Sequence, residues 1–332
     1  MPEISYTRVN DNTPVLVGCA QLTDKRGVEG YNYLEILTEV SKKALIDCEA
    51  SKDFRQEIDT VGVIRFVADT PQRDSATSDL WGYPNMPRSL ARSLGFNAKN
   101  EIYTTTGGNS PQIAINELAN RIKDKQIECA LLSGGEALDT FVTRLKDGLE
   151  VNWSDEPGGE PEIIGKSEDG TNDHEKIHGI FNPSSVYPLF ANSLRGLNNQ
   201  TVQEHMNDTG ELFERFSKVA SKNKYSWFPI HRSAEEIALT QPENRMIGLP
   251  YTKYMNSIMR VNQSCALILM SAKKARELGI PTSKWVFMYA GACINDIWNV
   301  SDRVDYSSSP AIKACSDNVF ELADVKLSLI HI

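Results

Sequence analysis

The amino-acid sequence predicts an α/β fold built on a mostly parallel sheet. Across residues 15–135, short apolar runs rich in β-branched residues alternate with amphipathic segments of helix length. The connections between these segments are short, and strand–helix–strand units of this kind form parallel sheets covered by helices. A buried-strand pattern returns at residues 264–270 after a long interruption. We therefore expect one sheet assembled from both parts of the chain, with an insertion between them.

The elements before the interruption follow a regular order. Strands are expected at residues 15–17, 61–66, 101–104 and 129–133. Helices are expected at residues 33–47, 88–94 and 110–124. Gly95 ends the second of these helices, and Pro111 lies in the first turn of the third, where its missing N–H is tolerated.

The rest of the chain predicts an insertion followed by a return to the sheet. Residues 140–255 are rich in Gly, Pro and Asp at first and then helical at 211–224. After them we expect a strand at 264–270, a helix at 271–278, a strand at 285–290 and a helix at 310–322. The expected domains are a core half (1–139 with 256–284), an inserted loop domain (140–255) and the start of a second half (285–326).

The C-terminal residues 327–332 are expected to be a non-native tail. Residues 328–332 resemble translated sequencing-adapter sequence, and we interpret the chain as C-terminally truncated. A sheet that lacks part of its covering is then expected to expose apolar surface.

Charge and cysteine content exclude several classes of function. The net charge of −9 and the pI near 5.2 argue against a nucleic-acid binder, which needs a basic face. Acidic runs at 155–162 and 168–173 are interpreted as a solvated loop, with no metal site expected. The six cysteines form no Cys-x-x-Cys pair, which suits reduced thiols in a cytoplasmic protein. No run approaches the roughly 18 apolar residues of a membrane span, so no membrane partner is expected.

Several motifs, in their order along the chain, resemble the thiolase superfamily. These are Pro14-Val-Leu-Val-Gly18, Leu131-Leu-Ser-Gly-Gly-Glu136, Tyr187-Pro-Leu-Phe-Ala-Asn192, the segment 213–225, Val261–Ser271 and Ser308-Ser-Pro-Ala311. The likeness spans residues 14–326 and is greatest to sterol-carrier-protein-type thiolases and thiolase-like acetyl-CoA acetyltransferases. The second motif departs from the family pattern, with Ser133 in place of an alanine and no residue between Gly135 and Glu136. The resemblance implies a thiolase-like α/β fold of layered βαβαβ halves, the second half incomplete.

The resemblance also locates the position of a missing nucleophile. In thiolases an acylated cysteine begins the helix after the third strand, and an ungapped alignment puts Gly108 at that position. Glycine has no side chain to acylate, and the segments that bring the family's base histidine and second cysteine are absent from this chain. Ordinary thiolase turnover is therefore not expected, although the hydroxyls of Thr106 and Ser110 lie nearby in sequence.

The Gly107-Gly108 pair is open to two interpretations. It can be a tight turn that needs φ > 0 or close packing, or a ligand-facing turn whose N–H groups meet a thioester carbonyl or phosphate. With the resemblance we prefer the second, and the candidate acyl-CoA site is Gly107, Gly108, Asn109, Tyr187 and Phe190. Two further points concern single residues. Glu136, at a strand end, is expected either to cap the next turn or to face the pocket, and Cys265 and Cys293 are expected to be buried.

The function implied is that of an acyltransferase-like protein of lipid metabolism that binds coenzyme A or acyl-CoA, with no covalently bound cofactor. The alternatives are a non-catalytic acyl-CoA- or lipid-binding or scaffold subunit, and a retro-aldol enzyme with an OB-fold partner. By the same resemblance we expect a homodimer that pairs through the strand at 101–105.

Overall fold

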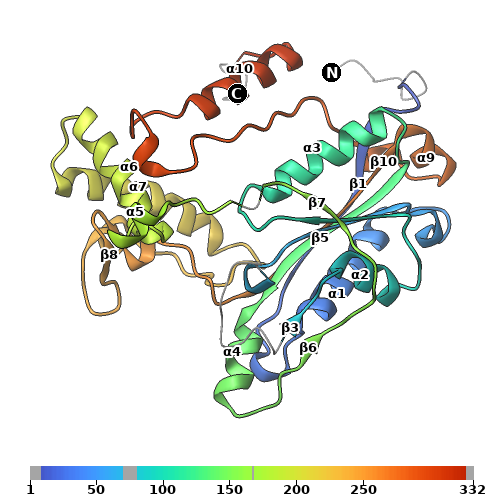
Figure 1. Cartoon of the computed structure of the whole chain (residues 1–332), viewed down its shortest axis with the longest axis horizontal. Helices are drawn as coiled ribbons and strands as arrows, with labels where there is room; N and C mark the ends of the chain where they lie inside the picture. Colours follow the sequence, from blue (N-terminus) through green and yellow to red (C-terminus); the bar gives the residue numbers. More distant parts are fainter. Residues whose placement is uncertain (1–8, 70–80, 167, 327–332) are drawn as a thin grey trace. The chain divides into compact units, whose positions relative to one another are not determined.

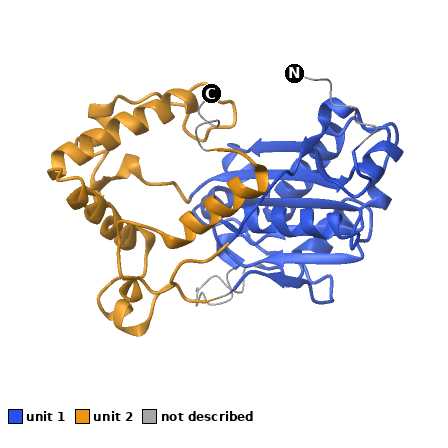
Figure 2. Cartoon of the chain, turned by 90° about the horizontal axis from the view of Figure 1, so that it is seen from above, with its two compact units in different colours: residues 1–167, 260–293 blue, residues 168–259, 294–332 orange. Residues whose placement is uncertain are grey.

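The computed structural model describes residues 9–69, 81–166 and 168–326. The chain divides into two compact units, coloured separately in Figure 2. The first unit comprises Met1–Ser167 and Arg260–Cys293, and the second comprises Glu168–Met259 and Ile294–Ile332. The expected division into a core half, a loop domain and the start of a second half stays a prediction, and the proposed tail lies outside the described residues.

A sheet of seven strands organises the first unit. Figure 1 shows this sheet together with its helices. Its strand order is β11-β1-β10-β5-β2-β4-β7. The strands are β1 (Pro14–Thr23), β2 (Thr60–Ile64), β4 (Asn100–Thr104), β5 (Cys129–Ala137), β7 (Glu162–Ile164), β10 (Asn262–Ser271) and β11 (Val286–Phe287). Strands β5, β2, β4 and β7 run parallel, whereas β10, β1 and β11 add antiparallel pairs. The expected α/β class with a parallel-rich sheet is confirmed. The short strands β3 (Trp81–Gly82) and β6 (Trp153–Ser154) pair separately.

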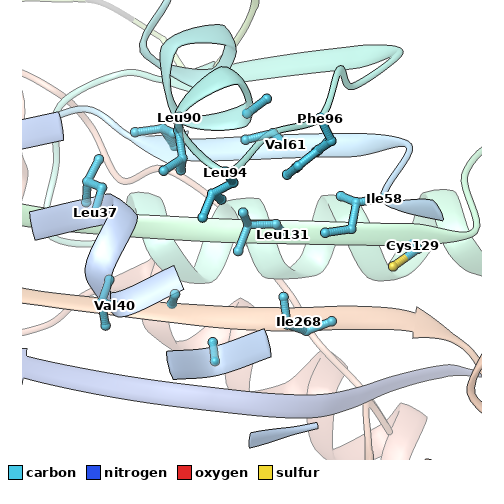
Figure 3. Close-up of a cluster of buried hydrophobic side chains, with 14 of the residues drawn as sticks. Leu37, Val40, Ile58, Val61, Leu90, Leu94, Phe96, Cys129, Leu131 and Ile268 are labelled. Carbon is cyan, nitrogen blue, oxygen red and sulfur yellow. The ribbon is translucent and has the colours of Figure 1, made fainter. Parts of the chain in front are cut away.

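Helices cover both faces of this sheet. They are α1 (Tyr33–Asp47), α2 (Met86–Ser93), α3 (Ser110–Lys123), α4 (Leu138–Lys146) and α9 (Ala272–Glu277). Helices α1 and α2 pack on one face, where Leu37 and Leu90 share a buried cluster with Leu131 and Ile268 (Figure 3). Helix α3 packs on the other face, where Leu118 and the β10 residue Leu269 belong to a second buried cluster. Successive side chains of a strand thus point to opposite faces of the sheet and pack in different buried clusters, because side-chain direction alternates along a β-strand.

The second unit is mostly helical. It contains α5 (Asp173–Ile177), α6 (Pro183–Leu197), α7 (Val202–Ala220), α8 (Ala234–Ala238), β8 (Met246–Gly248), β9 (Tyr251–Thr252) and α10 (Pro310–Ala323). Its core includes Met206, Ile237 and Met255. Helix α7 begins at Val202, earlier than the expected residue 211, because Thr201 and Glu204 form a capping box.

The outer edge of β4 is not free, and the expectation that residues 101–105 form an edge for pairing with a second copy is wrong. Strand β7 pairs there in parallel, with Ile102 opposite Glu162 and Thr104 opposite Ile164. The sequence offered no sign of this strand, because its side chains are mostly exposed and show no apolar alternation.

Helix α10 of the second unit exposes apolar side chains, whereas the expected exposure of the sheet stays a prediction. Helix α10 has no buried residue, and Ile312 and Leu322 are 72% and 62% exposed.

Candidate functional site

The glycine corner, residues 105–110, joins the end of β4 to the start of α3. Two hydrogen bonds of Thr105 hold its first residue: the Thr105 N–H donates to the Ile164 carbonyl at 2.9 Å, and the Thr105 carbonyl accepts from Ser110 Oγ at 2.7 Å. The Ser110 N–H donates to the Gly107 carbonyl at 3.1 Å. The four residues between Thr105 and Ser110 are therefore held at both ends.

Three consecutive backbone amides of the corner are free to bind a ligand. Within the described part of the chain, the N–H groups of Gly107, Gly108 and Asn109 have no acceptor. They precede the 14-residue helix α3, whose N-terminus carries partial positive charge. Gly108 and Asn109 are exposed to solvent. Such a run of N–H groups can receive an anion or a carbonyl oxygen that gains negative charge.

Nothing in the backbone requires glycine at position 108. Neither Gly107 nor Gly108 has a positive φ angle. A Cβ atom built on Gly108 meets no heavy atom within 4 Å, whereas one on Gly107 would lie 2.9 Å from Asn109 Oδ1. The tight-turn interpretation therefore does not explain Gly108, which leaves open space where a side chain would stand.

A buried polar network supports the end of β4, and sequence reasoning missed it. Arg65 donates from its backbone N–H to Thr104 Oγ1 and from Nε to the Thr104 carbonyl, both at 3.1 Å. Its guanidinium lies 3.8 Å from the centre of the Tyr103 ring and 3.0 Å from Asp69 Oδ2. Tyr103 donates to the same Asp69 oxygen at 2.6 Å. Burial raises the pKa of the Asp69 carboxyl and, together with the charge of Asp69, that of the Tyr103 phenol.

Glu136 ties the end of β5 to the segment after β2. Its carboxylate accepts from the Val67 N–H at 2.7 Å and from the Tyr33 hydroxyl at 3.3 Å. Burial first, and the Glu136 charge second, raise the pKa of Tyr33 well above its ordinary value. Both roles expected of Glu136 stay predictions, because the Val67 N–H belongs to the turn after β2 and not to the turn that follows β5.

The two hydroxyls near the corner differ in their surroundings. Ser110 is 3% exposed, and its hydroxyl donates to Thr105. Thr106 is half-buried and has a partner of its own. The sequence of the first unit contains no histidine, so its own residues supply no imidazole base to activate either hydroxyl.

Tyr187 and Phe190 belong to helix α6 of the second unit. Tyr187 is 62% exposed. The Phe190 ring packs edge-to-face on Tyr306 at 5.8 Å between centroids, and the Arg303 guanidinium carbon lies 5.1 Å from the Phe190 centroid. The corner residues thus belong to the first unit, whereas Tyr187 and Phe190 belong to the second, where Phe190 is packed and Tyr187 is exposed.

Cys265 and Cys293 are exposed, so the expectation that both are buried is wrong. Cys265 lies in β10 on the face of Leu269, opposite α1, and α3 packs on that face at Leu269 but leaves Cys265 uncovered. Cys48 and Cys129 are the buried thiols. Burial raises the pKa of Cys48 to about 12.

The described residues show neither a metal-binding cluster nor a membrane-spanning helix. They contain no group of three or more His, Cys, Asp or Glu side chains placed to hold a metal ion. Among the helices that the structure describes, none combines the length and apolar character that crossing a membrane requires.

The fold is similar to several solved structures. A monomeric SCP2-thiolase-like protein type 1 from Mycobacterium smegmatis shares 30% identity over 96% of this chain and 59% of its own, with a TM-score of 0.76. The Ltp2–ChsH2(DUF35) aldolase shares 14% identity over 96% and 72%, with a TM-score of 0.61. The acetyl-CoA acetyltransferase of Syntrophomonas wolfei shares 15% identity over 96% and 77%, with a TM-score of 0.58.

The chain spans 59% of the length of the Mycobacterium protein. No protein-family model matches the chain, and a search of curated proteins gave no match. The strand order and these structural likenesses agree with one another, and the chain has a thiolase-like fold.

Proposed function

We propose that the chain is an acyltransferase-like protein of thiolase type that binds acyl-CoA at the glycine corner. The observation that carries this proposal is the run of three free amides at Gly107, Gly108 and Asn109, ahead of helix α3. The N–H groups would receive the thioester oxygen, on which negative charge grows when the carbonyl is polarised. The ligand class is coenzyme A and its acyl thioesters, with no covalently bound cofactor.

The open space at Gly108 sets a limit on the chemistry. A thiolase step needs a nucleophile that attacks the thioester carbon and expels CoA, and glycine supplies none. The corner can orient a thioester and withdraw electrons from its carbonyl group, and neither action forms an acyl-enzyme. We therefore propose binding and polarisation, without ordinary thiolase turnover.

A second candidate function has its own support. The Ltp2–ChsH2(DUF35) aldolase shares the fold over 96% of this chain. Retro-aldol cleavage removes a proton from a hydroxyl group and needs no acylated cysteine, so Gly108 is compatible with it. In that case the thioester site would stay the same, and an OB-fold partner protein would complete the enzyme. A non-catalytic acyl-CoA- or lipid-binding subunit is the third candidate.

The setting of the protein is proposed from the same reasoning. Six cysteines without a Cys-x-x-Cys pair suit the cytoplasm, and acyl-CoA binding suits lipid metabolism. A homodimer would have to use a surface other than the outer edge of β4, because β7 occupies that edge.

The first test is calorimetric titration of the purified chain with CoA and with acetyl-CoA. Asn109→Pro removes one of the three amide donors. The φ angle of Asn109 in the structure is −92°, which is near the range that proline adopts. Asn109→Ala, the matched control, keeps the N–H, and the structure shows no hydrogen bond from the Asn109 side chain to the helix end.

We expect wild type and Asn109→Ala to bind acetyl-CoA with micromolar affinity. Asn109→Pro should bind it about tenfold more weakly, because one hydrogen bond to the polarised thioester oxygen is lost. A folded protein that binds neither CoA nor acetyl-CoA would overturn the proposal. Equal affinities of the Pro and Ala variants would remove the corner amides from the site.

A further inference from the structure

We infer that residues 162–165, here called the β7 strap, fix the geometry of the glycine corner and act as its positioning element. This inference rests on the proposed function for its meaning in ligand binding, whereas its structural part can be measured without a ligand. Three separate contacts carry it, and all three lie within the first unit.

The first contact extends the sheet into the corner. Strand β7 pairs with β4 up to Thr104 opposite Ile164. One residue further, the Thr105 N–H donates to the Ile164 carbonyl at 2.9 Å. The strap therefore holds the first residue of the corner, beyond the end of the strand itself.

The second contact joins the strap to the helix on the other side of the corner. Glu162 accepts two hydrogen bonds from Arg121 of α3, at 2.6 and 2.8 Å. Arg121 also donates to Glu117 at 2.7 Å, which orients its guanidinium. Hydrogen bonding to Arg121 lowers the pKa of Glu162, so the pair stays ionised at neutral pH. Two-point pairing of this kind fixes direction as well as distance.

The third contact is a close approach that only glycine allows. Gly165 has a φ of +104°, and a Cβ atom there would lie 2.2 Å from Thr105 Oγ1. The strap chain thus passes directly against the side chain of the residue that it holds.

Together these contacts connect the β7 strap to the end of β4, to the glycine corner and to helix α3. Strand β4 alone fixes residues up to Thr104, and helix α3 alone fixes residues from Ser110 onward. The strap contacts both elements, so it sets the distance and direction between the two ends of the corner. Donors for a thioester oxygen must be held to within about 0.5 Å to be effective. A segment that looks like a surface loop therefore controls the free amides.

The experiment compares Gly165→Ala and Glu162→Ala with a matched control, Gly158→Ala. Gly158 is another glycine of positive φ, +75°, just before the strap, but a Cβ atom there meets nothing within 4 Å. The ligand-independent readout is hydrogen exchange of the peptide that covers residues 105–110, in which the Thr105 and Ser110 amides are hydrogen-bonded and the Thr105 amide reports directly on the strap. The ligand-dependent readout is calorimetric affinity for acetyl-CoA.

We expect exchange in that peptide to become about tenfold faster in Gly165→Ala, the effect of losing one backbone hydrogen bond. Glu162→Ala should show a smaller change in the same direction, and Glu162→Gln should recover part of it. Gly158→Ala should match wild type. Acetyl-CoA affinity should fall in the same order as exchange rises.

Three results are decisive. Unchanged exchange at 105–110 in Gly165→Ala would overturn the inference. Faster exchange with unchanged acetyl-CoA affinity would show that the strap stabilises the fold without positioning the site, and would also overturn it. A wild-type protein that binds no acetyl-CoA would refute the proposed function alone, and faster exchange would still support the strap's control of the corner.

Discussion

The buried hydroxyl of Ser110 offers a quantitative test of how the corner is closed. Ser110 Oγ donates to the Thr105 carbonyl at 2.7 Å, and Ser110 is 3% exposed. Ser110→Ala removes this donor and leaves the carbonyl without its side-chain partner. Loss of one partner of a buried hydrogen bond costs about 1–3 kcal/mol in the free energy of unfolding. Because Thr105 is only half-buried, water can reach its carbonyl in part, and we expect the lower half of that range.

Ser41 supplies a matched control in the same unit. Its side chain is fully buried in helix α1, but Ser41 Oγ has no hydrogen-bond partner among the described residues. Ser41→Ala removes an unsatisfied polar group and improves helix propensity by up to about 0.5 kcal/mol. The same chemical change is therefore expected to leave stability unchanged or to raise it.

The assay is urea unfolding followed by far-UV circular dichroism. Ser110→Ala should lower the midpoint with an unchanged m value, and Ser41→Ala should keep or raise it. A Ser110→Ala protein as stable as wild type would refute the claim that this hydroxyl closes the turn. An equal loss in both variants would show that the hydrogen bond is not the cause.

Three other predictions concern Gly108, the carboxylate of Glu175 and the thiols. Gly108→Cys should fold with wild-type stability, because a Cβ atom at this position meets no heavy atom within 4 Å. Incubation of this variant with acetyl-CoA should give an acetyl thioester on the cysteine and release CoA, which intact mass spectrometry can detect. A destabilised variant, or a variant that binds acetyl-CoA without forming the adduct, would contradict the assignment of position 108. Glu175 accepts the Ser301 and Asn172 N–H groups, mainly the former, which lowers its pKa from the ordinary 4.5 to about 2. The stability that the Glu175 carboxylate contributes is therefore complete above pH 4.5 and is lost as the pH falls toward 2. The thermal unfolding temperature of Glu175→Gln should accordingly depend less on pH than that of wild type between pH 4.5 and 2. Parallel pH profiles of the two proteins would contradict the stabilising role of these hydrogen bonds. Iodoacetamide should modify the exposed Cys19 in the native protein but leave Cys48 and Cys129 unmodified, because burial raises the pKa of the Cys48 and Cys129 thiols. Peptide mass spectrometry can measure the labelling of each cysteine. Early labelling of Cys48 would disprove its burial.

Local patterns were sufficient to predict much of the fold. The expected helix over residues 33–47 agrees with α1 at both ends, because an apolar face and the Asn32–Glu35 capping box lie within the segment itself. The strand start at Cys129 and the helix start at Ser110 agree as well, whereas the strand continues to Ala137, beyond its expected end at residue 133. These features depend on residues a few positions apart, which a single sequence displays directly.

Elements that depend on distant partners were missed or misplaced. Strand β7 has three residues with mostly exposed side chains, and it is a strand only because β4, some 60 residues earlier in the chain, offers its edge. The network of Arg65, Asp69 and Tyr103 likewise forms where two parallel strands end side by side. The exposure of Cys265 depends on how far α3 extends over its sheet face.

By itself, the sequence determined the α/β class, the thiolase resemblance and the absence of a side chain at Gly108. Composition, periodicity and the identity of one residue are all properties of the linear chain. Only the tertiary structure decided that Gly108 faces open space, that the corner amides are free and that the distant β7 strap pairs with Thr105 at the start of the corner. Those facts depend on which backbone groups meet across the sheet edge, and hydrogen bonds between segments far apart in sequence are formed only when the chain folds.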